Sequence, residues 1–397
     1  MVAAPSRQAS VITFGCVMTP SAIDILKDLV AINSINPKCQ ADGPGEVECA
    51  RYVSALFQKH GIDFELQKVF PDRHNVIARL DGKERSKRLV FEAHMDTVAI
   101  TGMTIPPFQP TIKEDKLYGR GACDTKGSLA GMLAALIATK DSPSRAANIV
   151  LVASVDEEHA FRGVGRFCED CGPANGAVVG EPTELDPVIA HKSAVRWRTT
   201  IHGRAAHTSR PELGRNAISQ AVKLIAMVEG DWLPNVRAKK HPILDRGEMT
   251  VSLIGGGTQI NFVPDTCWFE IDRRTLPGED RPGVLGEFQR YLDAMKKDDP
   301  DFRYSIDMTM PDDWAMETDP KERIAQVAHA ACKAVRPSAR LCGVPYGTDA
   351  SKLSRAGIPS IVLGPGSIAQ AHTADEWVEV RQVEQAAEVY QQIMETF

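Results

Sequence analysis

The sequence predicts an α/β fold in which a mixed, mostly parallel twisted sheet carries helices on both faces. The first observation is a set of short apolar segments typical of strands buried on both sides, of which Asn148–Val155 is the clearest. The second is that these segments alternate with amphipathic helical repeats, an order that favours a layered α/β core. The third is that acidic or imidazole side chains directly follow the apolar segments, where ligands bind in such sheets.

Length and composition are those of an ordinary globular protein. The 397 residues are enough for two domains, and 43% hydrophobic and 25% charged residues are usual values. The net charge of −6 provides no basic surface for nucleic acid, and no apolar run reaches the roughly 18–20 residues that span a bilayer. We therefore expect no nucleic-acid or membrane partner. Nine scattered cysteines favour a reducing cytoplasm over a disulfide framework.

The N-terminal part supplies several helices and strands. Residues 1–17 are interpreted as a loose extension or an upstream start before Met18. A first helix is expected after Thr19-Pro20, because Thr19 is suited to cap a helix and Pro20 to begin one. The further elements expected before residue 188 are helices over 46–60 and from 129, and strands over 63–68, 75–79, 90–94, 148–155 and 176–180.

The pattern changes after Pro187, and residues 188–308 are interpreted as an inserted α+β domain. A half-exposed strand is expected over Arg196–Ile201, where polar and apolar residues alternate. Together with later elements it forms a βαββαβ-like block of domain size. Residues 1–187 and 309–397 then form the main domain. The later elements are helices over 216–229 and 283–296 and strands over 250–254, 268–271 and 303–308, followed after the insertion by a helix over 321–335, a strand over 360–363 and a last helix.

His94 and Asp96 stand at the end of an apolar segment, where strand alternation places both on one face. A carboxylate beside an imidazole fixes the tautomer of the ring and raises its basicity, as a metal site requires. Asp124 precedes an apolar helical repeat that begins at Leu129, and from there it could bridge two divalent cations. A lone His-x-Asp is more often structural, so this interpretation depends on the residues that follow.

Further carboxylates close apolar segments of the same domain. Glu157-Glu158 follows the segment 148–155, and Glu181 follows the segment 176–180. Adjacent glutamates are usually a solvated surface pair. Here several carboxylates are expected at one sheet edge, and a pair of metal ions is the simplest compensation for their repulsion and burial.

Taken in order, these motifs resemble the dinuclear zinc amidohydrolase and peptidase family of acetylornithine deacetylase, succinyl-diaminopimelate desuccinylase and glutamate carboxypeptidase. The resemblance extends from residue 20 to residue 397, and it is closest to acetylornithine deacetylase over 180–183, 190–192 and 364–376. The matching positions are His94-x-Asp96, Asp124, Glu157-Glu158, Glu181, His207, Asn261, Arg274 and His372.

The resemblance implies two divalent metal ions, with Zn(II) expected and Co(II) as the alternative. Glu157 would act as general base and later as general acid, and Asp96 would orient His94. A cis peptide bond is implied after Asp124. The implied ligands are Asp124 as the bridge, His94 and Glu181 for one ion, and Glu158 and His372 for the other.

The resemblance also makes the inserted domain a lid and dimerisation domain of a homodimer. His207 would donate to the oxyanion, from the partner subunit, and Asn261 would help to hold the substrate. Arg274 would bind a substrate carboxylate through its forked guanidinium. An ornithine side chain would require a nearby acid, for which Asp349 is the candidate.

We therefore predict metal-dependent hydrolysis of the amide bond of small N-acyl amino acids, most specifically by an acetylornithine deacetylase of arginine biosynthesis. Within the same family, a carboxypeptidase, a dipeptidase or a succinyl-diaminopimelate desuccinylase would use the same metals and the same Arg274. From another class, a non-catalytic metal-binding scaffold would be expected to lack the base or a ligand, and none of these is missing.

Overall fold

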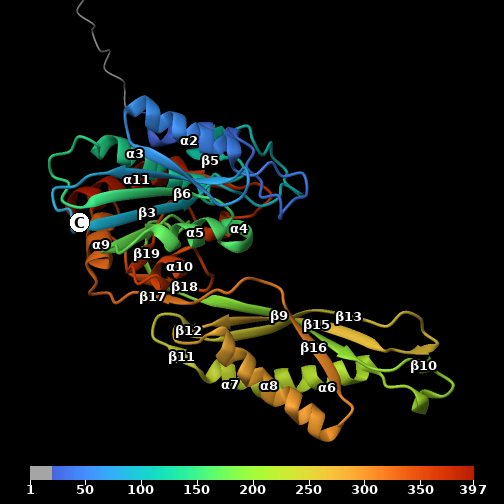
Figure 1. Ribbon diagram of the computed structural model, residues 1–397. Helices are drawn as coiled ribbons and strands as arrows, with labels where there is room; N and C mark the ends of the chain where they lie inside the picture. The colour runs from blue at the N-terminus through green and yellow to red at the C-terminus, as the bar shows by residue number, and fades with distance from the viewer. Residues whose placement is uncertain (1–19) are drawn as a thin grey trace, which may run out of the picture.

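The computed structural model describes residues 20–397, and the extension predicted for residues 1–17 lies outside this range. Two main sheets organise the described chain, one of nine strands and one of four (Figure 1). The strands of the smaller sheet all come from the continuous stretch 193–308, whereas the larger sheet is built from the chain on both sides of it.

The nine-stranded sheet has the order β1-β2-β6-β3-β7-β19-β8-β17, with β18 paired to β8. Its centre, β6-β3-β7-β19, is parallel, and antiparallel pairs extend it on both sides. The predicted mixed α/β class is confirmed. The strands are β1 Phe64–Lys68, β2 His74–Leu80, β3 Arg88–His94, β6 Asn148–Ser154, β7 Gly176–Val179, β8 Val188–His191, β17 Met316–Glu317, β18 Cys342–Val344 and β19 Ser360–Val362.

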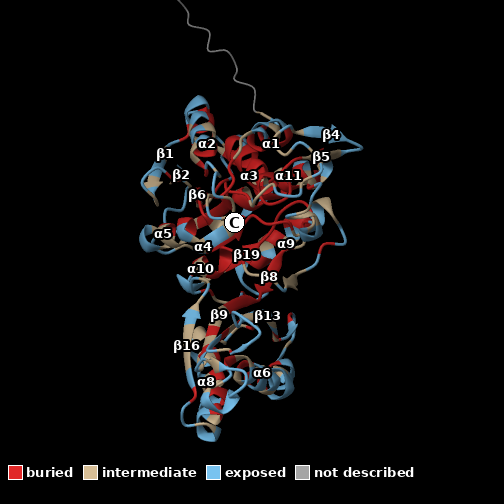
Figure 2. Ribbon diagram, turned by 90° about the vertical axis from the view of Figure 1, so that its right-hand side faces the viewer, coloured by how far each residue is buried: buried red, intermediate tan, exposed pale blue. Residues whose placement is uncertain are grey.

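Helices cover both faces of this sheet because its strands alternate between two cores. In β3, Leu89 and Phe91 lie in one core with α1, α3 and α11, and Val90 lies in the other with α5 and α10. Figure 2 shows that buried residues gather around α3, α11 and β19. The helices of this part are α1 Ala22–Ala31, α2 Val47–His60, α3 Lys126–Thr139, α4 Glu157–Ala160, α5 Arg162–Asp170, α9 Arg323–Val335, α10 Ala350–Arg355 and α11 Val380–Thr396.

The four-stranded sheet is antiparallel, in the order β13-β15-β9-β16. On one face Trp197 of β9 packs with Trp232 and Phe288 from the helical layer. On the opposite face, which carries the even-numbered residues of β9 and β15, the described chain places no helix (Figure 1). The elements are β9 Ser193–His202, β13 Glu248–Gly256, β15 Thr266–Thr275, β16 Arg303–Met308, α6 Ala217–Met227, α7 Leu233–Ala238 and α8 Arg281–Asp298.

The chain crosses between the two sheets at Lys192 and again between β16 and β17. Strand β8 pairs within the larger sheet, so residues 188–191 lie there and not in the inserted unit for which a start at 188 was predicted. We propose 193–308 as the inserted domain. The backbone ladders of its four long strands pair these strands only with one another, which is the physical reason for this limit.

Two further properties of the described chain concern membrane crossing and disulfides. Over residues 20–397, none of the helices has the length and apolar character needed to cross a bilayer. The cysteines in this range are free thiols, and the cytoplasmic location stays a prediction.

The short elements are β4 Thr111–Lys113, β5 Lys116–Tyr118 and β20 Trp377–Glu379 in a small sheet, the pairs β10 Ala206–His207 with β14 Phe262–Val263 and β11 Lys240–His241 with β12 Asp245–Arg246, the 3₁₀ turns Pro211–Leu213 and Ile368–Gln370, and a π-helical turn over Val228–Trp232.

Candidate metal centre

Polar side chains converge at the edge of the nine-stranded sheet where its parallel strands end. His94 is the last residue of β3, Glu157 and Glu158 begin α4 just after β6, and Glu181 follows β7. Asp124 reaches the same edge from the loop before α3. These residues meet because the carboxyl ends of neighbouring parallel strands share one edge.

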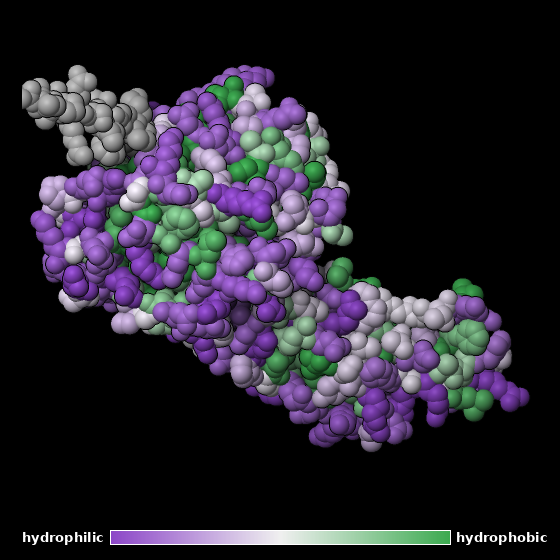
Figure 3. Space-filling model, turned by 45° about the horizontal axis from the view of Figure 1, so that its top comes forward, coloured by the Kyte–Doolittle hydropathy of each residue, from purple (hydrophilic) through white to green (hydrophobic). Residues whose placement is uncertain are grey.

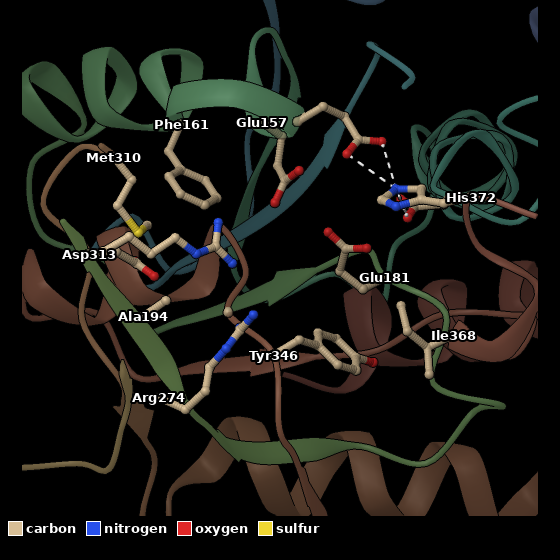
Figure 4. Close-up of a pocket in the computed structure, with 14 residues that line it drawn as sticks. Glu157, Phe161, Glu181, Ala194, Arg274, Met310, Asp313, Tyr346, Ile368 and His372 are labelled. Atoms are coloured by element: carbon tan, nitrogen blue, oxygen red, sulfur yellow. Dashed lines mark hydrogen bonds and ion pairs between the residues drawn. The ribbon is translucent and has the colours of Figure 1, made fainter. Parts of the chain in front are cut away.

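Two imidazoles lie on either side of Asp124. His94 Nε2 is 3.1 Å from Asp124 Oδ1, and His372 Nε2 is 3.2 Å from Asp124 Oδ2. Glu158 Oε2 lies 3.3 Å from the same nitrogen of His372, and Figure 4 shows both of these contacts of His372 as dashed lines. The two oxygens of Asp124 therefore face two separate groups of donors, the arrangement that a bridging carboxylate requires.

Two more carboxylates lie near His94. Glu181 Oε1 is 3.8 Å and Glu157 Oε2 is 4.0 Å from its Nε2 atom. The ligand atoms of His94, Glu157 and Glu181 lie within 4.8 Å of one another, and so do those of His94, Asp124 and Glu158. Imidazole nitrogens combined with carboxylate oxygens form the donor set of hydrolytic zinc sites. The geometry places Glu157 among the potential metal ligands. Position alone therefore does not distinguish a ligand role from the predicted role of general base.

The cluster carries more negative charge than its protein surroundings compensate. Burial raises the pKa of Glu157 and Glu181 well above the ordinary value, and burial together with Asp124 raises the pKa of Glu158 to about 7. Hydrogen bonds to Asp124 and Glu158 raise the pKa of His372 to about 10. Buried carboxylates of this kind require positive charge close by. Two divalent cations would supply that charge, so the residues present fit such ions.

Asp96 supports both the imidazole and the glutamate pair. His94 Nδ1 lies 3.0 Å from the backbone carbonyl of Asp96 and 3.5 Å from its carboxylate. That carboxylate accepts hydrogen bonds from the backbone N–H groups of Glu157 and Glu158, both at 3.2 Å, and from Asn36 Nδ2 at 2.8 Å. Asp96 therefore fixes the start of α4 as well as the ring. Asn36 was not predicted, because a single asparagine in a loop follows no recognisable pattern.

Glu376 holds the loop that carries Asp124, and it was also not predicted as a site residue. Its carboxylate accepts hydrogen bonds from the backbone N–H groups of Cys123 at 2.9 Å and Asp124 at 3.0 Å. Arg120 forms an ion pair with it at 2.6 Å. The Asp124–Thr125 peptide bond is cis, which confirms the expectation taken from the resemblance. The only indication of Glu376 in the sequence was its place at the end of the deacetylase-like segment.

A cavity of about 430 Å³ opens over the cluster. Figure 4 shows Glu157 and His372 on one side of it and the guanidinium of Arg274, from β15, reaching in from the other. Arg274 thus lies where a substrate carboxylate could meet it. Arg196 of β9 and Tyr346 also line the cavity and were not predicted, because neither belongs to a motif.

Of the candidate residues, His94 and Asp96 are buried within the cluster and do not line the cavity, and three others do not line it either. His207 on β10 and Asn261 beside β14 are exposed at the far end of the four-stranded sheet (Figure 1), where Thr208 N donates to the carbonyl of Asn261 at 3.0 Å. Asp349 is buried and its Oδ2 lies 3.5 Å from Ser154 Oγ, so it does not face a substrate.

Comparison with known proteins identifies the family. The sequence profile of peptidase family M20/M25/M40 matches residues 90–396. The chain belongs to this family. Among its relatives, an acetylornithine deacetylase of Myxococcus xanthus is 29% identical over 83% of this chain and 86% of its own length. A probable succinyl-diaminopimelate desuccinylase of Staphylococcus epidermidis is 26% identical over 94% of this chain and 97% of its own.

Solved structures agree in fold. A tripeptidase from Staphylococcus aureus superposes with a TM-score of 0.76 at 20% identity, covering 96% of this chain and 99% of its own. A dinuclear metal-binding M20 peptidase from Bacillus subtilis has a TM-score of 0.69 at 16% identity, covering 94% and 96%. The predicted family is confirmed, and the chain is a hydrolase of amide or peptide bonds.

Proposed function

We propose that the protein is a metal-dependent deacylase that hydrolyses the amide bond of N-acyl amino acids. The observation that carries the proposal is that one cavity holds both the carboxylate–imidazole cluster and the guanidinium of Arg274. The cluster is suited to metal ions and the guanidinium to the free carboxylate of an amino acid. The sequence predicts N-acetylornithine as the specific substrate, and the relative from Myxococcus xanthus is named for that activity.

The side chains at the cavity have separate roles in the proposed hydrolysis. When bound, two divalent ions would supply Lewis acidity that polarises the scissile carbonyl and acidifies water. Glu157, which lines the cavity, would take a proton from that water and give it to the leaving nitrogen. Arg274 would hold the substrate carboxylate, and Asp96 would keep the ring of His94 oriented. The residues that would hold the ions are His94, Asp124, Glu158, Glu181 and His372.

Glu157→Gln tests the role of the base. The substitution keeps the size of the side chain and removes its ability to accept a proton, so turnover is expected to fall by roughly 10²–10⁴-fold. Bound metal, measured by elemental analysis, is expected to stay near the wild-type value. Glu169→Gln, on the exposed surface of α5, is the control and should leave turnover unchanged. Unchanged turnover in Glu157→Gln would contradict the proposal.

A peptidase or a desuccinylase is the second candidate function. The names of the Staphylococcus epidermidis relative and the Staphylococcus aureus structure favour it. Amine release from N-acetylornithine, an N-succinyl amino acid and a dipeptide, each with Zn(II) or Co(II), separates the candidates. Cleavage of the dipeptide without cleavage of any N-acyl compound would assign the protein to the peptidases.

We propose that two chains pair through the inserted domain. Strand β13 is an edge of its sheet, and its Leu253 and Ile254 are 53% and 55% exposed. Val222 of α6, a helix that contacts β13, is 54% exposed. Figure 3 shows hydrophobic residues on the surface of the smaller part of the molecule, which is the inserted domain. An exposed apolar edge strand is a template for pairing. Ile254→Glu is expected to give a monomer by light scattering and to lower turnover, because His207 would then be absent from the site. Leu66→Glu, equally exposed on the main domain, is the control.

A further inference from the structure

Arg196 and Arg274 share one carboxylate on the helix-free face of the four-stranded sheet. In the β9–β15 ladder Arg196 lies opposite Asp272 and Arg274 lies opposite Ala194, so the two arginines are diagonal neighbours on one face. Arg196 Nε donates to Asp272 Oδ2 at 2.8 Å, and Arg274 Nε lies 2.9 Å from Asp272 Oδ1. One carboxylate therefore faces two guanidinium groups, which leaves one positive charge uncompensated.

Both guanidinium groups are accessible to a solute. The side chains of Arg196 and Arg274 are 43% and 32% exposed, and both line the cavity over the carboxylate–imidazole cluster. Within residues 20–397, Asp272 is the only carboxylate that forms an ion pair with either of them. Arg198, the next arginine on the same face, differs because it pairs one-to-one with Glu270 at 2.7 Å and does not line the cavity.

The acidic side chains that line the cavity are already engaged. Four of them form the metal cluster, and the fifth, Asp313, is bound by Lys352 Nζ at 2.5 Å. The ammonium group of an ornithine side chain would thus find no free carboxylate among the lining residues, and it would face two guanidinium groups. The electrostatics of the cavity oppose a cationic substrate side chain and favour an anionic one.

We propose that Arg196 is a specificity-determining residue that binds a second carboxylate of the substrate, beside the one held by Arg274. This inference rests on the proposed deacylase function and narrows its substrates to N-acyl amino acids that carry two carboxylates. The second carboxylate belongs either to an aspartate or glutamate side chain or to a dicarboxylic acyl group such as succinyl. Both sources present the same planar anion, which a guanidinium binds through two parallel hydrogen bonds.

The test compares compounds that differ in one charge. N-acetylglutamate and N-acetylglutamine have nearly the same shape, so the ratio of their kcat/KM values reports recognition of the side-chain carboxylate. N-succinylnorvaline against N-acetylnorvaline reports recognition of a carboxylate on the acyl group. The wild-type, metal-loaded enzyme is expected to prefer the dianionic member of at least one pair by about tenfold or more.

Substitutions at Arg196 should remove that preference. Arg196→Gln is expected to bring the ratio for the preferred pair close to one, with little effect on the monoanionic member, and Arg196→Lys should restore part of it. Arg196→Glu should improve turnover of N-acetylornithine relative to N-acetylglutamate, because the charge is reversed. Arg198→Gln, on the same strand and face, is the matched control and should keep the wild-type ratio. Metal content and melting temperature show that each variant is folded.

The outcomes separate this inference from the proposed function. Loss of the preference in Arg196→Gln with its retention in Arg198→Gln supports the second carboxylate site. Equal weakening of both members of each pair in Arg196→Gln would mean that both arginines hold the same carboxylate, and it would overturn the inference. Wild-type preference for N-acetylornithine would overturn it as well, with the deacylase function intact. No turnover of any compound would instead remove the proposed function.

Discussion

The two sheets of this protein present polar side chains in different ways. In the nine-stranded sheet the polar residues lie at an edge where parallel strands end, and they are crowded and mostly buried. In the four-stranded sheet they lie along one face of β9 and β15, half-exposed and in ladder register. At the strand ends, burial concentrates negative charge that bound cations would balance. On the half-exposed face of β9 and β15, the guanidinium groups stay accessible to a solute. The first region is therefore suited to chemistry and the second to recognition.

The largest expected effect tests whether the helix-covered face of the smaller sheet is purely structural. Trp197 is fully buried, with its ring 5.2 Å from that of Phe288, so Trp197→Ala should lower the free energy of unfolding by about 3–5 kcal/mol. Urea unfolding measures this change, and metal content should remain as in the wild type. Trp268→Ala, on the half-exposed face, is the control and should cost less. Equal losses of unfolding free energy in Trp197→Ala and Trp268→Ala would contradict this difference between the two faces of the smaller sheet.

The next effect tests the junction between the two sheets. Asp313 accepts hydrogen bonds from Ser193 and Ser351, both at 2.7 Å, and pairs with Lys352 at 2.5 Å, which ties the return connection to β9 and α10. Asp313→Asn leaves Lys352 buried without its partner and should cost roughly 3 kcal/mol of stability. Asp312→Asn, in an exposed pair, should cost far less. A negligible change in Asp313→Asn would show that the junction does not depend on this network.

The same network predicts a pH dependence. Burial opposes ionisation of Asp313, but the Lys352 ammonium and the hydrogen bonds from Ser193 and Ser351 outweigh it and lower the pKa of the carboxyl. The stabilisation is therefore present above the unfolded pKa of about 3.9 and is lost as the pH falls through the lower folded pKa. The difference in unfolding free energy between the wild type and Asp313→Asn should be large at neutral pH and shrink in acid. A difference that stays constant would contradict this origin.

A smaller effect tests the strand-end region. Asp96→Asn keeps the shape of the side chain but weakens its hold on the backbone N–H groups of Glu157 and Glu158. Metal affinity and turnover should fall by about 10–100-fold, as for other residues that orient metal ligands. Titration of the metal-free protein with Zn(II) measures the affinity. Wild-type affinity in this variant would mean that the cluster positions itself without Asp96.

The smallest effect compares helix caps in the two regions. Asp280 Oδ1 accepts from Gly283 N at the start of α8, and Ser21 Oγ accepts from Asp24 N at the start of α1. The first helix therefore begins after Ser21 and not at Pro20, as was predicted. Alanine at either cap should cost about 1 kcal/mol. Thermal unfolding of both variants tells whether the regions melt together, because separate transitions would make each substitution shift only one of them.

Sequence patterns located most of the long elements because burial imposes its period on the residues. The strand predicted over 303–308 agrees with β16, and the alternation over 196–201 indicated the central part of β9. Short edge elements such as β4 and β17 were missed, since two or three residues carry too little pattern. Arg196 was missed for a related reason: an arginine in a half-exposed strand is indistinguishable, in sequence, from one that only meets solvent.

By itself the sequence determined the α/β class and the family, and it predicted the residues of the candidate metal centre, because strand periodicity and ordered motifs can be read along the chain. Only the tertiary structure determined which residues from distant segments lie close together. It brought Asn36 and Glu376 to the loops that carry the cluster, placed His207 far from the cavity of its own chain, and set Arg196 beside Arg274. The physical reason is that strand register and the packing of distant segments fix these neighbours, and neither is contained in the spacing of residues along the chain.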